Sequence, residues 1–161
     1  MKLTDHVRSG DALGLLAALQ GGGDPNFVDS TGTPLVILAV REHQMPILAL
    51  LANHGADIDK RDRASWTAVM EAAYRGDADT LDLLAAHGAD FSLTDRDGND
   101  AGWLATRRCF FSIADQIEAY AASQQRRADM GARCARLTRG LHMPCAQTEP
   151  AGGNRGGSHG V

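Results

Sequence analysis

The chain has 161 residues, of which 43% are hydrophobic and 22% charged, and this composition excludes wholesale disorder. The net charge of -4 is unevenly spread, because residues 1–123 hold 10 basic and 18 acidic side chains whereas residues 124–161 hold 6 and 2. A body this acidic excludes a nucleic-acid-binding face on residues 1–123, since phosphates require a positive surface.

Residues 1–28 are predicted to contain two short helices. Leu3 and Val7 lie one helical turn apart, so the first helix has a single apolar stripe. Asp11 is a suitable N-cap for the second helix, from Ala12 to Leu19, and the three glycines that follow end it. The polar face of this segment suits a terminal cap, which must meet water on one side.

Residues 29–61 begin with a turn, and Thr33-Pro34-Leu35 opens a helix that runs to about Arg41. Proline suits the first helical turn, where its missing N–H is not needed. Pro46 is predicted to start the second helix of this segment in the same way.

Residues 62–94 repeat the arrangement, with Trp66-Thr67-Ala68 opening the first helix. Gly76 is predicted to end that helix, and Asp77 to cap the second one. The apolar side of the second helix includes Leu84.

Residues 95–123 are expected to form a fourth pair, with helices from Ala101 to Arg107 and from Ile113 to Ala122. Cys109 and Phe110 replace the Gly-Asp pair of the preceding segment. Such decay is expected of the closing unit of an array.

Residues 124–161 leave this pattern. Ala128 to Leu141 is predicted to be an arginine-rich helix, fused to the one before it or separate. From Pro144 onward the chain is rich in Gly, Ser and Pro and is predicted to be disordered.

The first three segments are copies of one another at an offset of 33 residues. The in-phase glycines and aspartates are Gly22, Gly55 and Gly88, and Asp24, Asp57 and Asp90. A fixed period of this length is typical of a stacked repeat protein, in which each unit covers its apolar face only against its neighbours.

These phased residues resemble the ankyrin repeat, whose 33-residue unit is a β-turn followed by two antiparallel helices. The resemblance is carried by Gly32-Thr33-Pro34-Leu35, Trp66-Thr67-Ala68-Val69, Ala39/Ala72/Ala105, Leu51/Leu84/Ile117, and Gly-Ala-Asp at 55–57 and 88–90. It implies an all-α ankyrin-repeat solenoid over residues 1–123, with about four units at 1–28, 29–61, 62–94 and 95–123. The Ala-, Gly- and Arg-rich style of the chain and its compactness indicate an array of bacterial type.

The chain departs from the family pattern in three ways. Val36 and Met70 stand where the family's Thr-Pro-Leu-His motif has a histidine that ties neighbouring turns together. Asp59 and Ser92 stand where family members often have asparagine. Thr33-Pro34 also falls one place early against Thr67-Ala68, which predicts an irregular first turn in the second unit.

Several patterns that suggest chemistry fail on inspection. Asp95-Arg96-Asp97-Gly98 suggests a calcium loop, but the first and last loop positions would be leucines instead of carboxylates. Cys134, His142 and Cys145 have no zinc spacing and lack a fourth ligand. We therefore predict no metal, no cofactor and no catalytic residue, and we interpret His54 and His87 as helix C-caps.

The resemblance implies that a partner binds the turn tips and the inner helices. By register, the candidate partner-binding residues are Thr33, Leu35, His43, Arg63, Trp66, Tyr74, Arg75, Arg96, Asn99, Arg107 and Arg108. Their mixture of arginine and aromatic side chains suits acidic or extended protein surfaces. Trp66 either packs against the neighbouring turn or is an exposed anchor, and the sequence leaves both possibilities open.

The functional prediction is a non-enzymatic module that binds an unknown protein partner through its concave face, as an adaptor, an inhibitor or an immunity-like protein. The alternative is a secreted or translocated effector that uses the basic C-terminal tail as a targeting signal. The longest apolar run, Leu35 to Val40, is too short to cross a membrane, and the N-terminal residues show no apolar signal region. Together with three irregularly spaced cysteines, this predicts a cytoplasmic protein, expected to be a monomer.

Overall fold

The computed structural model describes residues 2–140, with side chains as far as residue 130. Within these residues the chain forms eight helices that pair in chain order. The pairs are α1 (Leu3–Ser9) with α2 (Ala12–Gln20), α3 (Leu35–Arg41) with α4 (Met45–Asn53), α5 (Ala68–Arg75) with α6 (Ala78–Ala86), and α7 (Ala101–Arg107) with α8 (Phe111–Gly140). The all-α repeat architecture is confirmed. The disorder predicted from Pro144 and the candidate ligands His142 and Cys145 lie outside the described residues.

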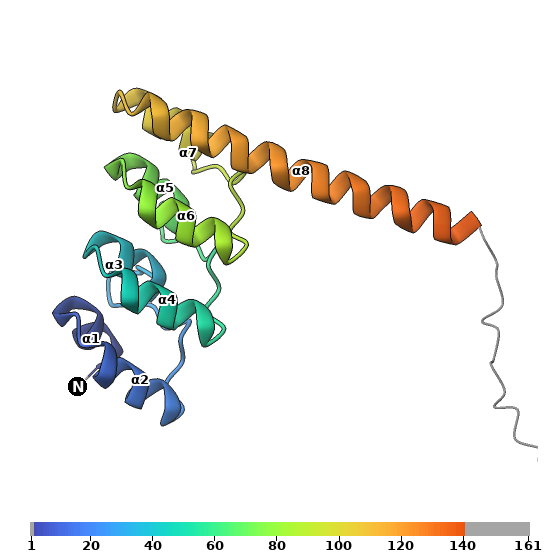
Figure 1. Ribbon diagram of the computed structural model, residues 1–161. Coiled ribbons are helices and arrows are strands. Elements are labelled where there is room, and N and C mark those ends of the chain that lie inside the picture. The colour runs from blue at the N-terminus through green and yellow to red at the C-terminus, as the bar shows by residue number, and fades with distance from the viewer. Residues whose placement is uncertain (1, 141–161) are drawn as a thin grey trace, which may run out of the picture. The chain divides into compact units, whose positions relative to one another are not determined.

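Residues Met1–Arg127 form one compact unit, in which the pairs are stacked one on another along the array (Figure 1). Residues 128–140 continue α8 and belong to a second unit. None of the helices within residues 2–140 combines the length and the apolar character needed to cross a bilayer.

A turn of constant design precedes each of the last three pairs. Asp29, Asp62 and Asp95, at 33-residue intervals, each accept hydrogen bonds from the backbone N–H groups two and four residues later, at 2.8–2.9 Å. The fourth residue of each turn has a positive φ, which is 87° at Gly32, 63° at Ser65 and 82° at Gly98. The period is therefore a property of the backbone as well as of the sequence.

The inner helices also end in a constant way. A residue with a positive φ, between 55° and 74°, follows each inner helix at 33-residue intervals. These residues are Gly10 after α1, His43 after α3, Gly76 after α5 and Cys109 after α7. Cys109 thus takes the same backbone conformation as Gly76, although its side chain makes that conformation costly. Asp11 and Asp77 then cap the outer helices by accepting from the N–H groups of Gly14 and Thr80.

Pro34 was predicted to stand in the first helical turn, but it is the N-cap of α3. Its structural equivalents are Thr67 and Asp100, which cap α5 and α7 by accepting from the backbone N–H of Met70 and Trp103. Proline has no side-chain acceptor, so α3 has no side-chain cap hydrogen bond. The irregular helix start predicted for the second unit is therefore a missing cap, while the backbone stays in phase.

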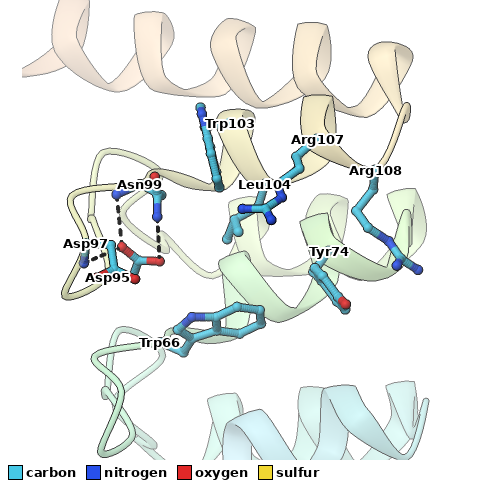
Figure 2. A pocket seen from close by; sticks show the side chains of 9 residues that line it. All are labelled: Trp66, Tyr74, Asp95, Asp97, Asn99, Trp103, Leu104, Arg107 and Arg108. Atoms are coloured by element: carbon cyan, nitrogen blue, oxygen red, sulfur yellow. Dashed lines mark hydrogen bonds between the residues drawn. The ribbon is translucent and has the colours of Figure 1, made fainter.

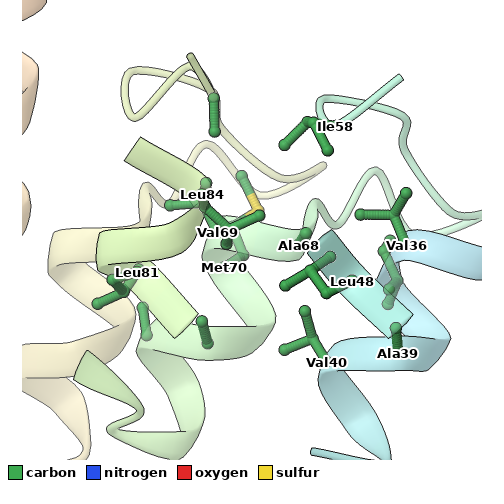
Figure 3. Packing of buried hydrophobic residues seen from close by; sticks show 14 of the residues in the cluster. Val36, Ala39, Val40, Leu48, Ile58, Ala68, Val69, Met70, Leu81 and Leu84 are labelled. Atoms are coloured by element: carbon green, nitrogen blue, oxygen red, sulfur yellow. The ribbon is translucent and has the colours of Figure 1, made fainter. Parts of the chain in front are cut away.

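The core runs continuously through the stack of helix pairs. Leu51 and Leu84 are both fully buried, and Ile117 in the same phase is 3% exposed. Alanines 39, 72 and 105 are also fully buried, which lets neighbouring inner helices approach closely. Figure 3 shows residues of α3 such as Val36 and Val40 on one side of this core, with Met70 and Leu84 of the next unit on the other.

Buried apolar side chains at Val36 and Met70 cannot supply the hydrogen bonds of the family's histidine. The loops between units are linked by other groups. Asn26 accepts from the backbone N–H of Asp57 at 2.7 Å, and Asp59, in the same phase, accepts from that of Asp90 at 2.8 Å.

The final helix does not end at Ala122 but continues to Gly140, which is the fused form of the two helices predicted for this part of the chain. Glycines 22, 55 and 88 follow the earlier outer helices with positive φ values of 80–94°. The residue in phase with them is Ala121, which has no such stop signal and lies inside α8. Gln124 of α8 instead accepts from the N–H of Phe91 at 3.3 Å and donates to the carbonyl of Ala89.

Candidate partner-binding groove

A groove of about 490 Å³ opens between the third and fourth units, on the side of the inner helices (Figure 2). Its walls come from α5, α7 and the two turns that precede these helices. The lining residues are Trp66, Tyr74, Asp95, Asp97, Asn99, Trp103, Leu104, Arg107 and Arg108. Aromatic rings, guanidinium groups and carboxylates therefore share one concavity.

Trp66 is held at the edge of this groove by its own turn. Its backbone N–H donates to Asp62 Oδ1 at 2.9 Å, and its carbonyl accepts from the N–H of Asp62 at 3.0 Å. The indole is half-buried and packs edge-on against Tyr74, with ring centroids 5.5 Å apart and an angle of 65°. Trp66 thus packs within its own unit and keeps part of its ring open to the groove. It is therefore neither fully buried against a neighbouring turn nor a fully exposed anchor.

Two arginines lie over aromatic rings in the groove. The guanidinium carbon of Arg108 is 4.4 Å from the ring centroid of Tyr74, and that of Arg107 is 5.2 Å from the ring centroid of Trp103. Both arginines are exposed, and they come from the last residue of α7 and its C-cap. Contacts of this kind restrict the guanidinium groups by cation–π attraction.

Trp103 was not among the predicted residues, although its ring is 43% exposed and lines the groove. Its equivalents one and two units earlier are Met70 and Ile37, which are buried, so the period suggested a core position. The sequence did contain one signal that Trp103 faces the surface. Arg107, a charged residue, lies four residues later on the same helix and hence on the same face.

The turn at the other end of the groove is acidic. Asp95 accepts from the backbone N–H groups of Asp97 and Asn99, both at 2.9 Å, and Asn99 Nδ2 donates to its second oxygen at 3.2 Å. The hydrogen bond from the N–H of Asn99 is the main reason why the pKa of Asp95 is lowered. Both carboxylate oxygens of Asp95 thus accept hydrogen bonds from within its own turn. Residues 2–130 contain no group of three side chains placed to hold a metal ion.

The other arginines of the inner helices have carboxylate partners. Glu71, 5% exposed, lies between Arg41 and Arg75, with Nε–O distances of 3.2 and 2.8 Å. Arg41 also lies 3.7 Å from Asp62. Arg41 and Arg75, which are in phase with Arg107 and Arg108, are therefore paired with carboxylates of the protein itself.

Nine of the eleven predicted partner-binding residues lie at the surface, in three groups. Trp66, Tyr74, Asn99, Arg107 and Arg108 line the groove. His43 and Arg75 line a neighbouring hollow of about 510 Å³, where His43 Nδ1 lies 2.9 Å from Asp77 Oδ2. Arg63 and Arg96 are exposed on the turns outside the groove.

Thr33 and Leu35 are not on the surface, which corrects their place among the contact residues. Leu35 is fully buried because it is the structural equivalent of Ala68 and Ala101, on the packed side of the inner helices. Thr33 is 5% exposed, and its hydroxyl lies 3.0 Å from that of Thr31 within the turn.

The two histidines predicted as C-caps both occupy that position, at the ends of α4 and α6. His54 Nδ1 lies 2.9 Å from the carbonyl oxygen of Leu50, which also accepts from the backbone N–H of His54 at 3.1 Å. These rings lie at the outer helices and have no part in the groove.

Residues 3–95 match the family model described as ankyrin repeats in three copies. The mouse protein named "Ankyrin repeat and SAM domain-containing protein 6" is 40% identical over 63 residues, which make up 36% of this chain and 7% of that protein. M-phase phosphoprotein 8 from rat and from mouse is 37% identical over 73 residues, 44% of this chain and 9% and 8% of those proteins. The chain therefore spans less than a tenth of the length of these relatives.

Proposed function

Since this chain belongs to the ankyrin repeat family, we propose that it is a non-enzymatic binding module that grips one protein partner in the groove between its third and fourth units. Ankyrin repeats generally mediate contacts between proteins, because their stacked units present a continuous surface on a rigid core. The partner and its process are not identified by the fold, since one scaffold serves many partners.

One observation carries the choice of this groove. Trp66, Tyr74 and Trp103 are exposed or half-buried aromatic side chains, and they meet two exposed arginines in one concavity. Trp, Tyr and Arg are the residue types most enriched among the side chains that dominate binding energy at interfaces. The α5–α7 layer beneath them is buried and holds them in place.

The finer parts of this proposal rest on the sequence. An adaptor or inhibitor needs no catalytic group, and the prediction that this chain has none rests on its sequence motifs. We expect it to act in the cytoplasm, because its thiols are few and irregularly spaced, and we propose that it is a monomer.

The test is affinity capture from the native extract with matched surface variants. Trp66→Ala and Arg108→Ala remove a ring and a guanidinium from the groove, whereas Phe111→Ala removes an aromatic ring that is 61% exposed and outside it. We expect the first two variants to lose a co-purifying protein that the wild type and Phe111→Ala both retain. Equal recovery by all four proteins would exclude the groove as the binding surface.

A further inference from the structure

The stack contains a ladder of arginine–aspartate pairs that breaks in the third unit. Arg8 Nη2 lies 3.5 Å from Asp29 Oδ2, and Arg41 Nη2 lies 3.7 Å from Asp62 Oδ2, each pair separated by 21 residues in the sequence. At the next step the arginine is replaced by Tyr74, so the turn aspartate, Asp95, receives no guanidinium from α5. The groove lies at this break.

The arginine of the next step is Arg107, and its neighbour is Arg108. Within the part of the chain whose side chains are described, no carboxylate oxygen lies within 4.0 Å of either one. This separates them from Arg8, Arg41 and Arg75, which all have such a partner. Two adjacent guanidinium groups in the groove therefore carry uncompensated positive charge on a unit that is acidic overall.

The two free guanidinium groups are also restrained. Each one lies over an aromatic ring, Arg108 over Tyr74 and Arg107 over Trp103. A guanidinium that packs by its plane keeps its N–H edge available, and this edge matches a carboxylate with two parallel hydrogen bonds. Such preorganisation lowers the entropy lost when an anion binds.

We propose, on the premise that the groove is the binding surface, that its occupant is an extended acidic peptide segment. Carboxylates of this segment bind Arg107 and Arg108, and an apolar side chain next to them packs on Trp66. Asp95 and Asp97 at the turn end of the groove repel further carboxylates, so the acidic residues are confined to the α7 end. The missing arginine at Tyr74 leaves Asp95 without a guanidinium from α5, whereas Arg107 and Arg108 have no carboxylate partner of their own among the described side chains and are therefore available to an external anion.

The direct test is an NMR titration of the full chain with a blocked peptide in which glutamates alternate with leucines. The matched controls are the same peptide with glutamine, and with lysine, in place of glutamate. We expect the glutamate peptide to shift the side-chain Nε–Hε signals of Arg107 and Arg108 and the indole signal of Trp66. Binding of the glutamine or lysine peptide with equal affinity would overturn the proposal, and so would the absence of any shift with the glutamate peptide.

Variants separate a forked contact from charge alone. Arg107→Gln and Arg108→Gln are each expected to weaken the glutamate peptide by about tenfold, as the loss of a charge-assisted pair. Arg108→Lys keeps the charge but loses the fork and should weaken binding nearly as much. Arg126→Gln, outside the groove, should leave the affinity unchanged, and an equal loss there would show a general charge effect and overturn the site.

The outcomes also distinguish this inference from the proposed function. If a captured partner is lost with Trp66→Ala but retained with both Arg→Gln variants, the groove stands and the acidic occupant is excluded. If the partner is retained with every groove variant, the binding surface itself is wrong. Thermal unfolding of each variant checks that it is folded. We expect unfolding temperatures close to that of the wild type for the arginine variants, because Arg107 and Arg108 are exposed and outside the core.

Discussion

The carboxylate of Asp59 accepts a hydrogen bond from the backbone N–H of Asp90 at 2.8 Å, across the boundary between the second and third units. The same link joins Asn26 to Asp57 at 2.7 Å one unit earlier, where an amide oxygen is the acceptor. Both oxygens lie at hydrogen-bond distance from the N–H group, but only the acceptor of the second unit, Asp59, is a carboxylate. This difference makes the link at Asp59 dependent on pH.

Burial raises the pKa of Asp59, and the nearby carboxylates of Asp90 and Asp57 add to the effect, against the hydrogen bond from Asp90 and the charge of Arg61. A carboxyl group with a raised pKa in the folded state contributes stability below its unfolded value of 3.8, and this contribution is lost as the pH rises through the folded value. At neutral pH the ionised Asp59 therefore lowers the stability of the folded protein.

Asp59→Asn should consequently stabilise the protein at neutral pH, because the amide keeps the acceptor oxygen and removes the buried charge. The advantage should shrink as the pH falls and vanish below 3.8, where Asp59 itself is neutral. Urea midpoints of both proteins at the two pH extremes measure this. Asp97→Asn, which removes an equal charge from an exposed site, is the control, and an identical gain there would assign the effect to net charge.

Ser65→Gly should stabilise the protein. Ser65 has a φ of 63° in a turn where Gly32 and Gly98 have 87° and 82°. The left-handed conformation costs an L-residue about 1–2 kcal/mol, and the greater freedom of glycine in the unfolded chain offsets about 0.5–1 kcal/mol of that. Thermal or urea unfolding should show a gain of up to about 1 kcal/mol.

The matched control for this turn is Ser30→Gly. Ser30 is exposed and does not have a positive φ, so the same chemical change should destabilise by about 0.5–1 kcal/mol. A loss of stability in both variants would mean that Ser65 is unstrained in its turn.

The 33-residue period and the capping residues allowed the helices to be predicted closely. Helix α7 has the predicted bounds, from Ala101 to Arg107, and Asp77 caps α6 as expected. The predicted helix end at Ala122 was wrong because the prediction extended the period to a place where Ala121 stands instead of glycine, whereas the alternative of a fused helix agrees with α8. A missing stop signal is visible in the sequence, but the length of the continued helix depends on what it packs against.

The groove was only partly predictable. Trp66 and Tyr74 follow from the register, since turn tips and inner helices face the surface in this architecture. Trp103 did not, because its equivalent Met70 is buried, and the period does not say which unit leaves its side chain exposed. The absence of carboxylate partners at Arg107 depends on distances between units, which the sequence does not contain.

Leu84→Ala tests the claim that each unit is stabilised by its neighbours. Leu84 is fully buried in the continuous core of the stack. Removing its side chain should cost about 2–5 kcal/mol through lost burial and the remaining cavity. Leu13→Ala, at a leucine that is 80% exposed, should change stability by less than about 0.5 kcal/mol. Urea midpoints that fall equally in both variants would refute the packing described here.

Glu71 couples the inner helices α3 and α5, because it pairs with Arg41 of the former and Arg75 of its own helix. Glu71 is 5% exposed, whereas the side chains of Arg41 and Arg75 are 36% and 44% exposed. Water can therefore solvate the two guanidinium groups when the carboxylate is removed. Glu71→Gln should therefore cost about 1–2 kcal/mol, less than the loss of a fully buried pair. Glu42→Gln, at an exposed carboxylate, should change stability by less than about 0.5 kcal/mol.

A double-mutant cycle assigns this cost to the link between units. If Arg41 and Glu71 interact across the α3–α5 layer, Arg41→Gln should cost measurable stability in the wild type and much less in Glu71→Gln, with a coupling of about 0.5–3 kcal/mol. The same cycle with Arg75 measures the contact within α5, which i,i+4 geometry limits to a few tenths of a kcal/mol on an open helix. A larger coupling for Arg75 than for Arg41 would mean that Glu71 stabilises its own helix instead of the stack.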